Sequence, residues 1–152
     1  MTRLFRKVLC PIDFSEQSLA ALEVALKVVQ QNDAALYLLN VAPMTAGAAG
    51  FQPVPMDAYP IVEKDKREQL EKLAQKRIPA AVRCKTIVTS GDPAEQVLET
   101  ARDLDADLIV MGTHGRKGLG HLVLGSVAER IVRESPIPVL TAHSTARVRK
   151  AA

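Results

Sequence analysis

Five short apolar runs alternate with longer stretches in which apolar residues recur at helical spacing. Residues 34–41 are almost entirely apolar, without the alternation of a strand that has one face in water. Both faces of this strand are therefore expected to be covered, as in parallel sheets. Leu19, Leu22 and Leu26 recur at three- and four-residue intervals, which is the pattern of a helix lying on a sheet. The predicted strands are residues 7–12, 34–41, 82–89, 107–111 and 137–141.

This alternation predicts an α/β fold: a single-domain, open five-stranded parallel sheet, with right-handed crossovers that place helices on both faces. The sequence Asp92-Pro93-Ala94-Glu95 combines a capping aspartate, a first-turn proline and a glutamate at the third helical position, which indicates a helix start. Residues 61–77 are charge-rich and predict a solvent-exposed helix, and residues 126–134 predict a short one. Residues 42–60, rich in proline and glycine, predict a long loop.

Composition narrows the classes of function. The 152 residues are about one domain's length, expected to span 1–142 with a frayed tail at 143–152. No apolar run approaches the ~20 residues of a membrane helix, and no signal peptide is recognised, so a soluble cytoplasmic protein is expected.

The charge balance argues against nucleic-acid binding. The chain has 20 Lys and Arg against 17 Asp and Glu, and only 3% of its residues are aromatic. Cys10 and Cys84 have no CxxC spacing and are expected to be buried thiols.

Glycine is concentrated directly after the fourth predicted strand, in GTHGRKGLGHLVLGS from Gly112 to Ser126. Ligands of open parallel sheets bind beyond the carboxyl ends of the strands, near the point where strand order reverses. Glycine lets backbone N–H groups approach an anion, and a helix N-terminus adds unpaired donors. Arg116 and Lys117 add positive charge. The segment therefore predicts a phosphate-binding site.

Two familiar phosphate-binding motifs do not fit this segment. His121-Leu122 stands where a P-loop requires Lys-Ser/Thr. No third glycine completes GxGxxG after Gly118 and Gly120. The sequence therefore argues against a P-loop ATPase and an NAD-dependent dehydrogenase.

The spacing Gly112-x2-Gly115-x9-Gly125-Ser126 resembles the ATP-binding pattern of the universal stress protein family. The resemblance extends over nearly the whole chain: residues 7–15 resemble the family's opening strand and turn, and residues 91–93 and 135–140 resemble later landmarks. It implies a Rossmann-like fold of the adenine nucleotide alpha hydrolase type. It also implies ATP as ligand, Mg²⁺ or Mn²⁺ held through its phosphates, and a homodimer paired through the last strand, Ile137 to Thr141.

The resemblance also implies a role for each matching position. Pro11, Asp13 and Val41 would contact the adenosine end, and Met111 and Gly112 the ribose side. The phosphates would be met by Gly115, Gly125, Ser126 and Val127, through backbone N–H groups and the Ser126 hydroxyl. Charge and position alone, rather than the resemblance, add Arg116, His114 and Lys117 to the candidates.

Plainer interpretations stay open for several of these residues. Ser126 with Glu129 forms a capping box, and Asp13 with Glu16 would serve as a helix start. Met111 and Val41 are apolar strand ends under any interpretation.

For the whole chain, the first hypothesis is a nucleotide-dependent regulator in the stress response, with at most slow hydrolysis, since no Walker aspartate, arginine finger or water-orienting base is evident. The alternatives are a nucleotide-independent dimeric interaction protein and a true ATPase or nucleotidyl-transfer enzyme of the same fold.

Overall fold

The computed structural model describes residues 2–42, 55–113 and 124–144. Candidate residues His114, Gly115, Arg116 and Lys117 therefore lie outside the described residues. The elements in chain order are β1 (Lys7–Pro11), α1 (Glu16–Asn32), β2 (Ala35–Ala42), the 3-10 helix η1 (Met56–Ala58), α2 (Tyr59–Arg77), β3 (Cys84–Ser90), α3 (Pro93–Leu104), β4 (Leu108–Gly112), α4 (Ser126–Glu134) and β5 (Val139–Ala142).

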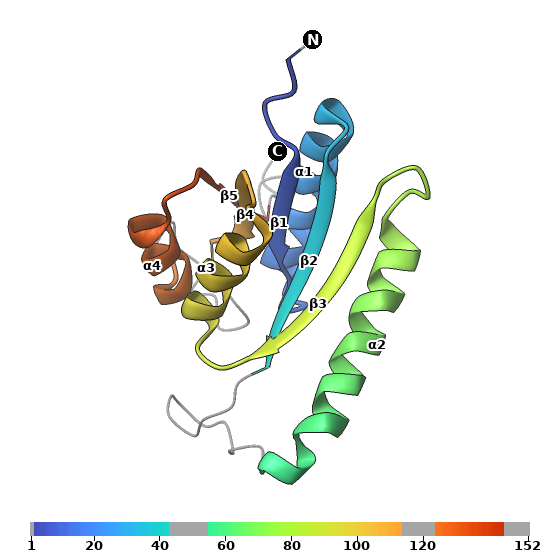
Figure 1. The fold of residues 1–152 in the computed structure, drawn as a ribbon, viewed down its shortest axis with the longest axis vertical. Helices are drawn as coiled ribbons and strands as arrows, with labels where there is room; N and C mark the ends of the chain where they lie inside the picture. Colours follow the sequence, from blue (N-terminus) through green and yellow to red (C-terminus); the bar gives the residue numbers. More distant parts are fainter. Residues whose placement is uncertain (1, 43–54, 114–123, 145–152) are drawn as a thin grey trace, which may run out of the picture.

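The strands form one sheet in the order β3-β2-β1-β4-β5 (Figure 1). Every neighbouring pair is parallel, with Pro11 opposite Leu39 and Leu9 opposite Ile109. The predicted five-stranded parallel sheet is confirmed. The chain builds β1, β2 and β3 outward in one direction and then returns to the other side of β1 with β4. The order therefore reverses between β1 and β4, which is where an open sheet of this kind has its binding crevice.

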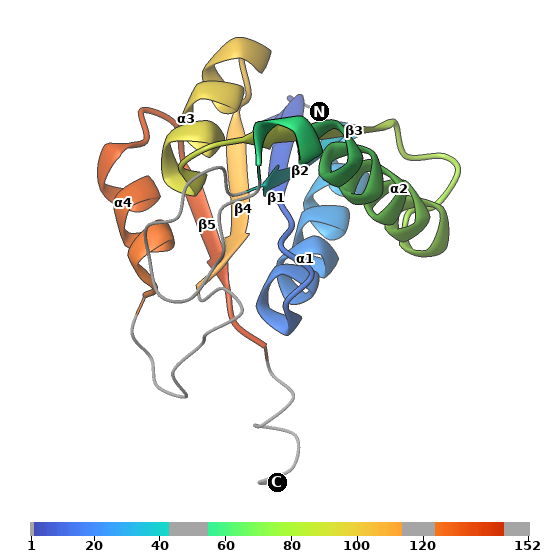
Figure 2. The same cartoon turned by 90° about the horizontal axis from the view of Figure 1, so that it is seen from below.

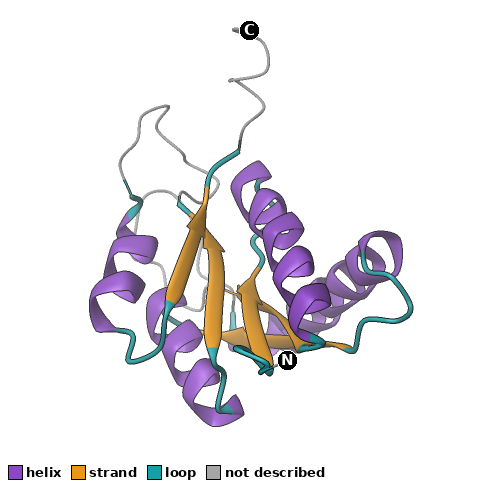
Figure 3. Ribbon diagram, turned by 90° about the horizontal axis from the view of Figure 1, so that it is seen from above, coloured by secondary structure: helices purple, strands orange, loops and turns teal. Residues whose placement is uncertain are grey.

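Helices cover both faces of the sheet, α1 and α2 on one side and α3 and α4 on the other (Figures 2 and 3). Each side has its own buried cluster. Leu22, Leu38 and Leu70 belong to the α1/α2 side and are fully buried. Leu9 and Ile131 belong to the α3/α4 side, which also buries Leu39 and Ile109. The double covering explains why the strands read as continuous apolar runs.

Two predicted boundaries differ from the structure because of proline. β5 begins at Val139 rather than at residue 137, because Pro138 has no N–H to donate, although its carbonyl still accepts from the Ile109 N–H at 3.0 Å. The predicted loop 42–60 extends too far toward the C-terminus, since α2 already begins at Tyr59. Pro60 lies in its first turn, where an N–H would have no partner. Among the described residues, no helix is long and apolar enough to cross a membrane.

Candidate functional site

The carboxyl ends of β1 and β4 lie side by side at the reversal point, and three apolar candidates share one face there. Because side chains alternate along a strand, Pro11, Val41 and Met111 point to the same side of the sheet as Leu9 and Leu39, toward α3 and α4. Met111 is 5% exposed and packs in that core, whereas Pro11 and Val41 are half-buried. The structure therefore places these three on one face of three neighbouring strands, as an apolar floor at the carboxyl edge of the sheet.

Asp13 shapes the turn that leaves β1. Its Oδ1 accepts hydrogen bonds from the Ser15 N–H at 2.9 Å and from the Ser15 hydroxyl. Ser15 in turn caps α1, where its Oγ accepts from the Ser18 N–H at 3.2 Å. The interpretation of Asp13 as the cap of this helix is wrong, since Ser15 holds that position. Asp13 is instead fixed by Ser15 just beyond the carboxyl end of β1, and Phe14 takes a left-handed conformation (φ 65°) between the two.

Asn40 holds the same turn from β2 and was not predicted as a site residue. It is 5% exposed, and its Nδ2 donates to the Ile12 carbonyl at 2.8 Å, while the Ile12 N–H donates to the Leu39 carbonyl at 2.8 Å. The chain carrying Asp13 away from the sheet is thereby tied to β2. The signal in the sequence was a single polar residue inside an otherwise apolar strand.

Gly112, the last residue of β4, lies against the first turn of α1. A Cβ at this position would meet the main-chain carbonyl carbon and oxygen of Gln17 at 2.7 and 2.8 Å. Contacts this close cannot be relieved by a side-chain rotation, so glycine is required by packing whether or not a ribose lies nearby. The Gln17 side chain also accepts the Ser144 N–H at 2.8 Å, which ties the segment after β5 to α1.

The N-terminus of α4 has a different cap from the one expected. The N-cap is Gly125, in an extended conformation, and among the described residues no side chain makes a cap hydrogen bond there. Ser126 is the first residue of the helix, so the capping-box interpretation of Ser126 with Glu129 is wrong. The Gly125 N–H, expected to face a phosphate, donates instead to the Thr113 carbonyl at 2.7 Å.

The N–H groups of Ser126 and Val127 remain as donors at this terminus. The first N–H groups of a helix have no intrahelical acceptor, and none is found for these two elsewhere in the described chain. Both residues are exposed. A negative charge placed here gains about 0.3–1 kcal/mol from the helix dipole. The geometry fits an anion at the same edge of the sheet as Asp13 and the apolar floor.

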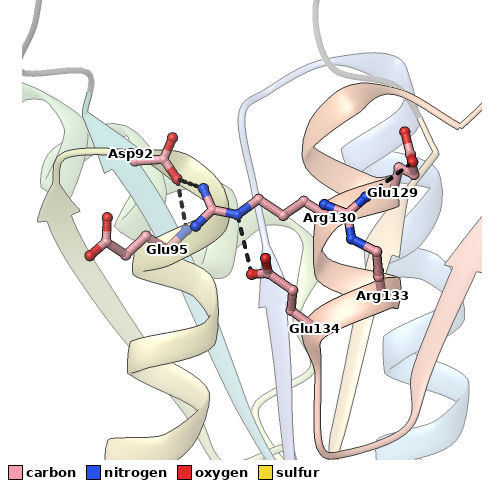
Figure 4. A network of polar contacts seen from close by, with 6 residues as sticks. All are labelled: Asp92, Glu95, Glu129, Arg130, Arg133 and Glu134. Atoms are coloured by element: carbon pink, nitrogen blue, oxygen red, sulfur yellow. Dashed lines mark hydrogen bonds and ion pairs between the residues drawn. The ribbon is translucent and has the colours of Figure 1, made fainter.

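A polar network fixes α4 relative to α3 (Figure 4). The Asp92 carboxylate caps α3 by accepting the Glu95 N–H at 2.9 Å, which confirms the predicted helix start. The same oxygen accepts from Arg130 Nη1 at 2.8 Å, and Arg130 Nε contacts Glu134 at 3.2 Å. Arg130 is thus engaged by acids on both helices. Among the described residues, no three His, Cys, Asp or Glu side chains are grouped as a metal site.

Comparison with known proteins places this geometry in a family. A sequence model of the universal stress protein family matches residues 4–143. The chain belongs to the universal stress protein family. Universal stress protein MJ0531 of Methanocaldococcus jannaschii is 34% identical over 141 residues, covering 90% of this chain and 81% of that protein.

Solved universal stress proteins have the same fold. UspA from Lactobacillus plantarum superposes with a TM-score of 0.72 at 23% identity, covering 93% of this chain and 99% of the other. A universal stress protein in complex with cAMP gives 0.64 at 23% identity, covering 93% and 98%. One from Archaeoglobus fulgidus in complex with dAMP gives 0.63 at 17% identity, covering 93% and 99%. At these identities the likeness establishes the fold alone.

Proposed function

We propose that this universal stress protein binds ATP in the crevice between β1 and β4 and acts as a nucleotide-dependent regulator in the cytoplasm. The observation that carries the proposal is the start of α4. Its cap is a glycine, and within residues 2–42, 55–113 and 124–144 no acceptor is found for the Ser126 and Val127 N–H groups, which lie with the Ser126 hydroxyl at the sheet's reversal point. Two structural neighbours described as cAMP and dAMP complexes support an adenine nucleotide as the class of ligand.

The nucleotide would lie across the carboxyl edge of the sheet. The half-buried Pro11 and Val41 would contact the adenosine, as would Asp13, whose carboxylate is oriented by Ser15. Met111 and Gly112 would border the ribose. The Ser126 and Val127 N–H groups would bind phosphate oxygens, while Gly125 would set the position of α4 through its bond to Thr113. Gly115, Arg116, His114 and Lys117 are proposed partners of the phosphates from the sequence alone.

The metal would be held chiefly through the nucleotide. Mg²⁺ keeps several waters and is usually bound through substrate phosphates and one or two carboxylates. When bound, Mg²⁺ or Mn²⁺ would neutralise charge on the phosphates. The Asp13 carboxylate is already hydrogen-bonded to the Ser15 N–H and hydroxyl, which suits positioning better than proton abstraction. We therefore propose binding with at most slow hydrolysis.

Self-association is the second part of the proposal. β5 is an edge strand, and its residues Val139, Leu140 and Thr141 are half-buried in the single chain. An uncovered strand edge is a template for pairing with another strand. We propose a homodimer joined through β5. The sequence places this contact at residues 137–141, but the strand that forms is Val139–Ala142, so the proposal uses these residues.

The start of α4 allows a sharp test. Ser126→Pro removes one N–H donor and the hydroxyl, yet proline is favoured at the first helical position. The preceding Gly125 already has φ −62° and ψ 161°, which a following proline tolerates. Ser126→Ala is the matched control, because it removes the hydroxyl and keeps the N–H. The fold should therefore survive in both variants.

The measurement is the melting temperature of nucleotide-free protein with and without millimolar Mg-ATP. At a ligand concentration 100 times Kd, stability rises by about 2.7 kcal/mol, which for a chain of this size shifts the melting temperature by roughly 5–11 °C. We expect the largest shift in the wild type, less in Ser126→Ala and least in Ser126→Pro. No shift in the wild type would overturn ATP binding and favour the nucleotide-independent interaction protein. Equal shifts in all three proteins would move the site elsewhere.

A further inference from the structure

Thr113 connects three segments that are distant in the sequence. It is 1% exposed and directly follows β4. Its N–H donates to the Ala142 carbonyl at 3.3 Å, and its carbonyl accepts from the Gly125 N–H at 2.7 Å. Its hydroxyl lies 3.2 Å from His143 Nδ1. One buried residue therefore bonds to the end of β5, to the residue after it and to the cap of α4.

The bond to Gly125 sets where α4 begins. Gly125 is the N-cap, and its own carbonyl accepts the Glu129 N–H at 2.9 Å, which starts the helix. The Ser126 and Val127 N–H groups follow immediately. Their position relative to the sheet therefore depends on the Thr113 carbonyl.

The other two bonds set where β5 ends. Ala142 is the last residue of this edge strand and pairs in register with Gly112. His143 comes next, and Ser144 is held by Gln17 on α1. The backbone of Thr113 thus extends the pairing of β4 with β5 by one residue, and its hydroxyl holds the residue beyond. The strand that we propose as the dimer edge shares this residue with the proposed phosphate site.

We propose that Thr113 is a positioning residue that links nucleotide occupancy at α4 to self-association through β5, with the hydroxyl acting through His143. This inference rests on the proposed function. A phosphate that holds the α4 N-terminus would stabilise the arrangement of Thr113 that also aligns Ala142 and His143. By thermodynamic linkage, the factor by which ATP strengthens the dimer equals the factor by which dimerisation strengthens ATP binding.

The test compares the dimer dissociation constant with and without saturating Mg-ATP, measured by sedimentation on the full chain. Thr113→Val removes the hydroxyl and keeps both backbone bonds, whereas Thr113→Ser restores the hydroxyl. His143→Ala removes the partner at an exposed position, so it should fold even where a change at the buried Thr113 does not. Ser135→Ala is the matched control, because it removes a hydroxyl that donates to the Ile137 carbonyl at 2.7 Å, near the opposite end of β5.

We expect ATP to tighten the wild-type dimer by about fivefold or more. The factor should be similar in Thr113→Ser and Ser135→Ala and fall toward one in Thr113→Val and His143→Ala. The double variant should behave like either single one, because both remove the same contact. Rescue by serine separates this role from a merely structural one.

The same samples report nucleotide binding through their melting shift. A wild type that binds ATP but has the same dimer constant with and without it, or that stays monomeric, overturns the inference and leaves ATP binding standing. An undiminished factor in both Thr113→Val and His143→Ala also overturns it. A wild type with no ATP-induced shift overturns the proposed function itself, and the inference with it.

Discussion

Gly112 and the main chain of Gln17 are so close that a Cβ on Gly112 would lie 2.7 Å from the Gln17 carbonyl carbon. Gly112→Ala should therefore force β4 and α1 apart, at a cost of about 1–3 kcal/mol for an overpacked site. Urea unfolding followed by circular dichroism measures the loss.

Truncating the side chain of Gln17 should not rescue this variant, because the two closest atoms belong to the backbone. Equal stability of Gly112→Ala and wild type would show that α1 shifts freely against β4. Rescue by Gln17→Ala would contradict this account, because alanine keeps all three of the closest atoms, the carbonyl carbon, the carbonyl oxygen and the Cβ. A loss of nucleotide binding in Gly112→Ala alone would not assign Gly112 to the ribose, since the fold changes too.

The start of α1 supports a second prediction. Ser15 accepts the Ser18 N–H as N-cap and donates to Asp13, so Ser15→Ala removes both interactions. We expect a loss of about 1 kcal/mol in stability from the cap. We also expect weaker ATP binding, because the Asp13 carboxylate loses one of the groups that orient it.

The control for Ser15→Ala is Ser18→Ala. It removes the hydroxyl that donates to the Ser15 carbonyl at 3.0 Å and keeps both the cap and the Asp13 contact. Urea unfolding and titration calorimetry with Mg-ATP measure the two effects. Unchanged ATP affinity in Ser15→Ala would contradict the idea that Ser15 positions Asp13.

Asp92 combines two roles that a pair of substitutions can separate. Asp92→Asn retains a good N-cap but loses the charge that faces Arg130, whereas Asp92→Ala loses both. The ion pair is exposed, with side chains 39% and 48% accessible, so it should contribute only about 0.2–1 kcal/mol.

We therefore expect Asp92→Asn to cost less than Asp92→Ala, by about the 1 kcal/mol typical of a lost cap. Arg130→Met removes the other partner of the ion pair. In 0.5 M salt its cost in unfolding free energy should become smaller, because salt screens exposed ion pairs. The difference in stability between Asp92→Asn and Asp92→Ala should stay the same, because salt does not screen a local cap. Equal costs for Asn and Ala would place the whole effect in the charge.

The fold could be predicted from the sequence because its signals are local and repeated. Helical and extended periodicity alternate along the chain, and the start of α3 is encoded within four residues, Asp92 to Glu95. Errors occurred at the ends of elements, where a single proline, Pro138 before β5 or Pro60 in the first turn of α2, affects which residue begins the element. The strand order follows from right-handed crossovers only once the reversal at β1 is known.

The site was less predictable because its supporting contacts are long-range. Thr113 meets His143 across 30 residues, Asn40 meets Ile12 across 28, and Gln17 meets Ser144 across 127. No spacing rule reports such pairs. The Ser126 capping box failed for a related reason: the local pattern was present, but Gly125, held by Thr113, occupies the cap.

The two cysteines lie on the same side of the sheet, with β2 between their strands. Cys10 on β1 is fully buried and Cys84 on β3 is half-buried, and both are free thiols. Strands two positions apart are separated by about 9–10 Å, beyond the reach of a disulfide. We therefore expect no disulfide between them after mild oxidation. Mass spectrometry checks this, and a loss of about 2 Da, the mass of two hydrogens, would contradict this arrangement.

Burial raises the pKa of both thiols, that of Cys84 to about 11. In the unfolded chain a thiol ionises near pH ~8.5, so above that pH the unfolded state loses protons that the folded state keeps. The stability due to these thiols is therefore complete below pH ~8.5 and is lost as the pH rises toward 11.

Two measurements check the raised pKa values. Iodoacetamide at pH 8 should modify neither cysteine quickly in the native protein, and it should modify both when guanidinium unfolds the chain. Between pH 8.5 and 11, the free energy of unfolding should fall less steeply in Cys84→Ala than in the wild type. Parallel slopes would mean that Cys84 ionises as readily in the folded protein as in the unfolded chain.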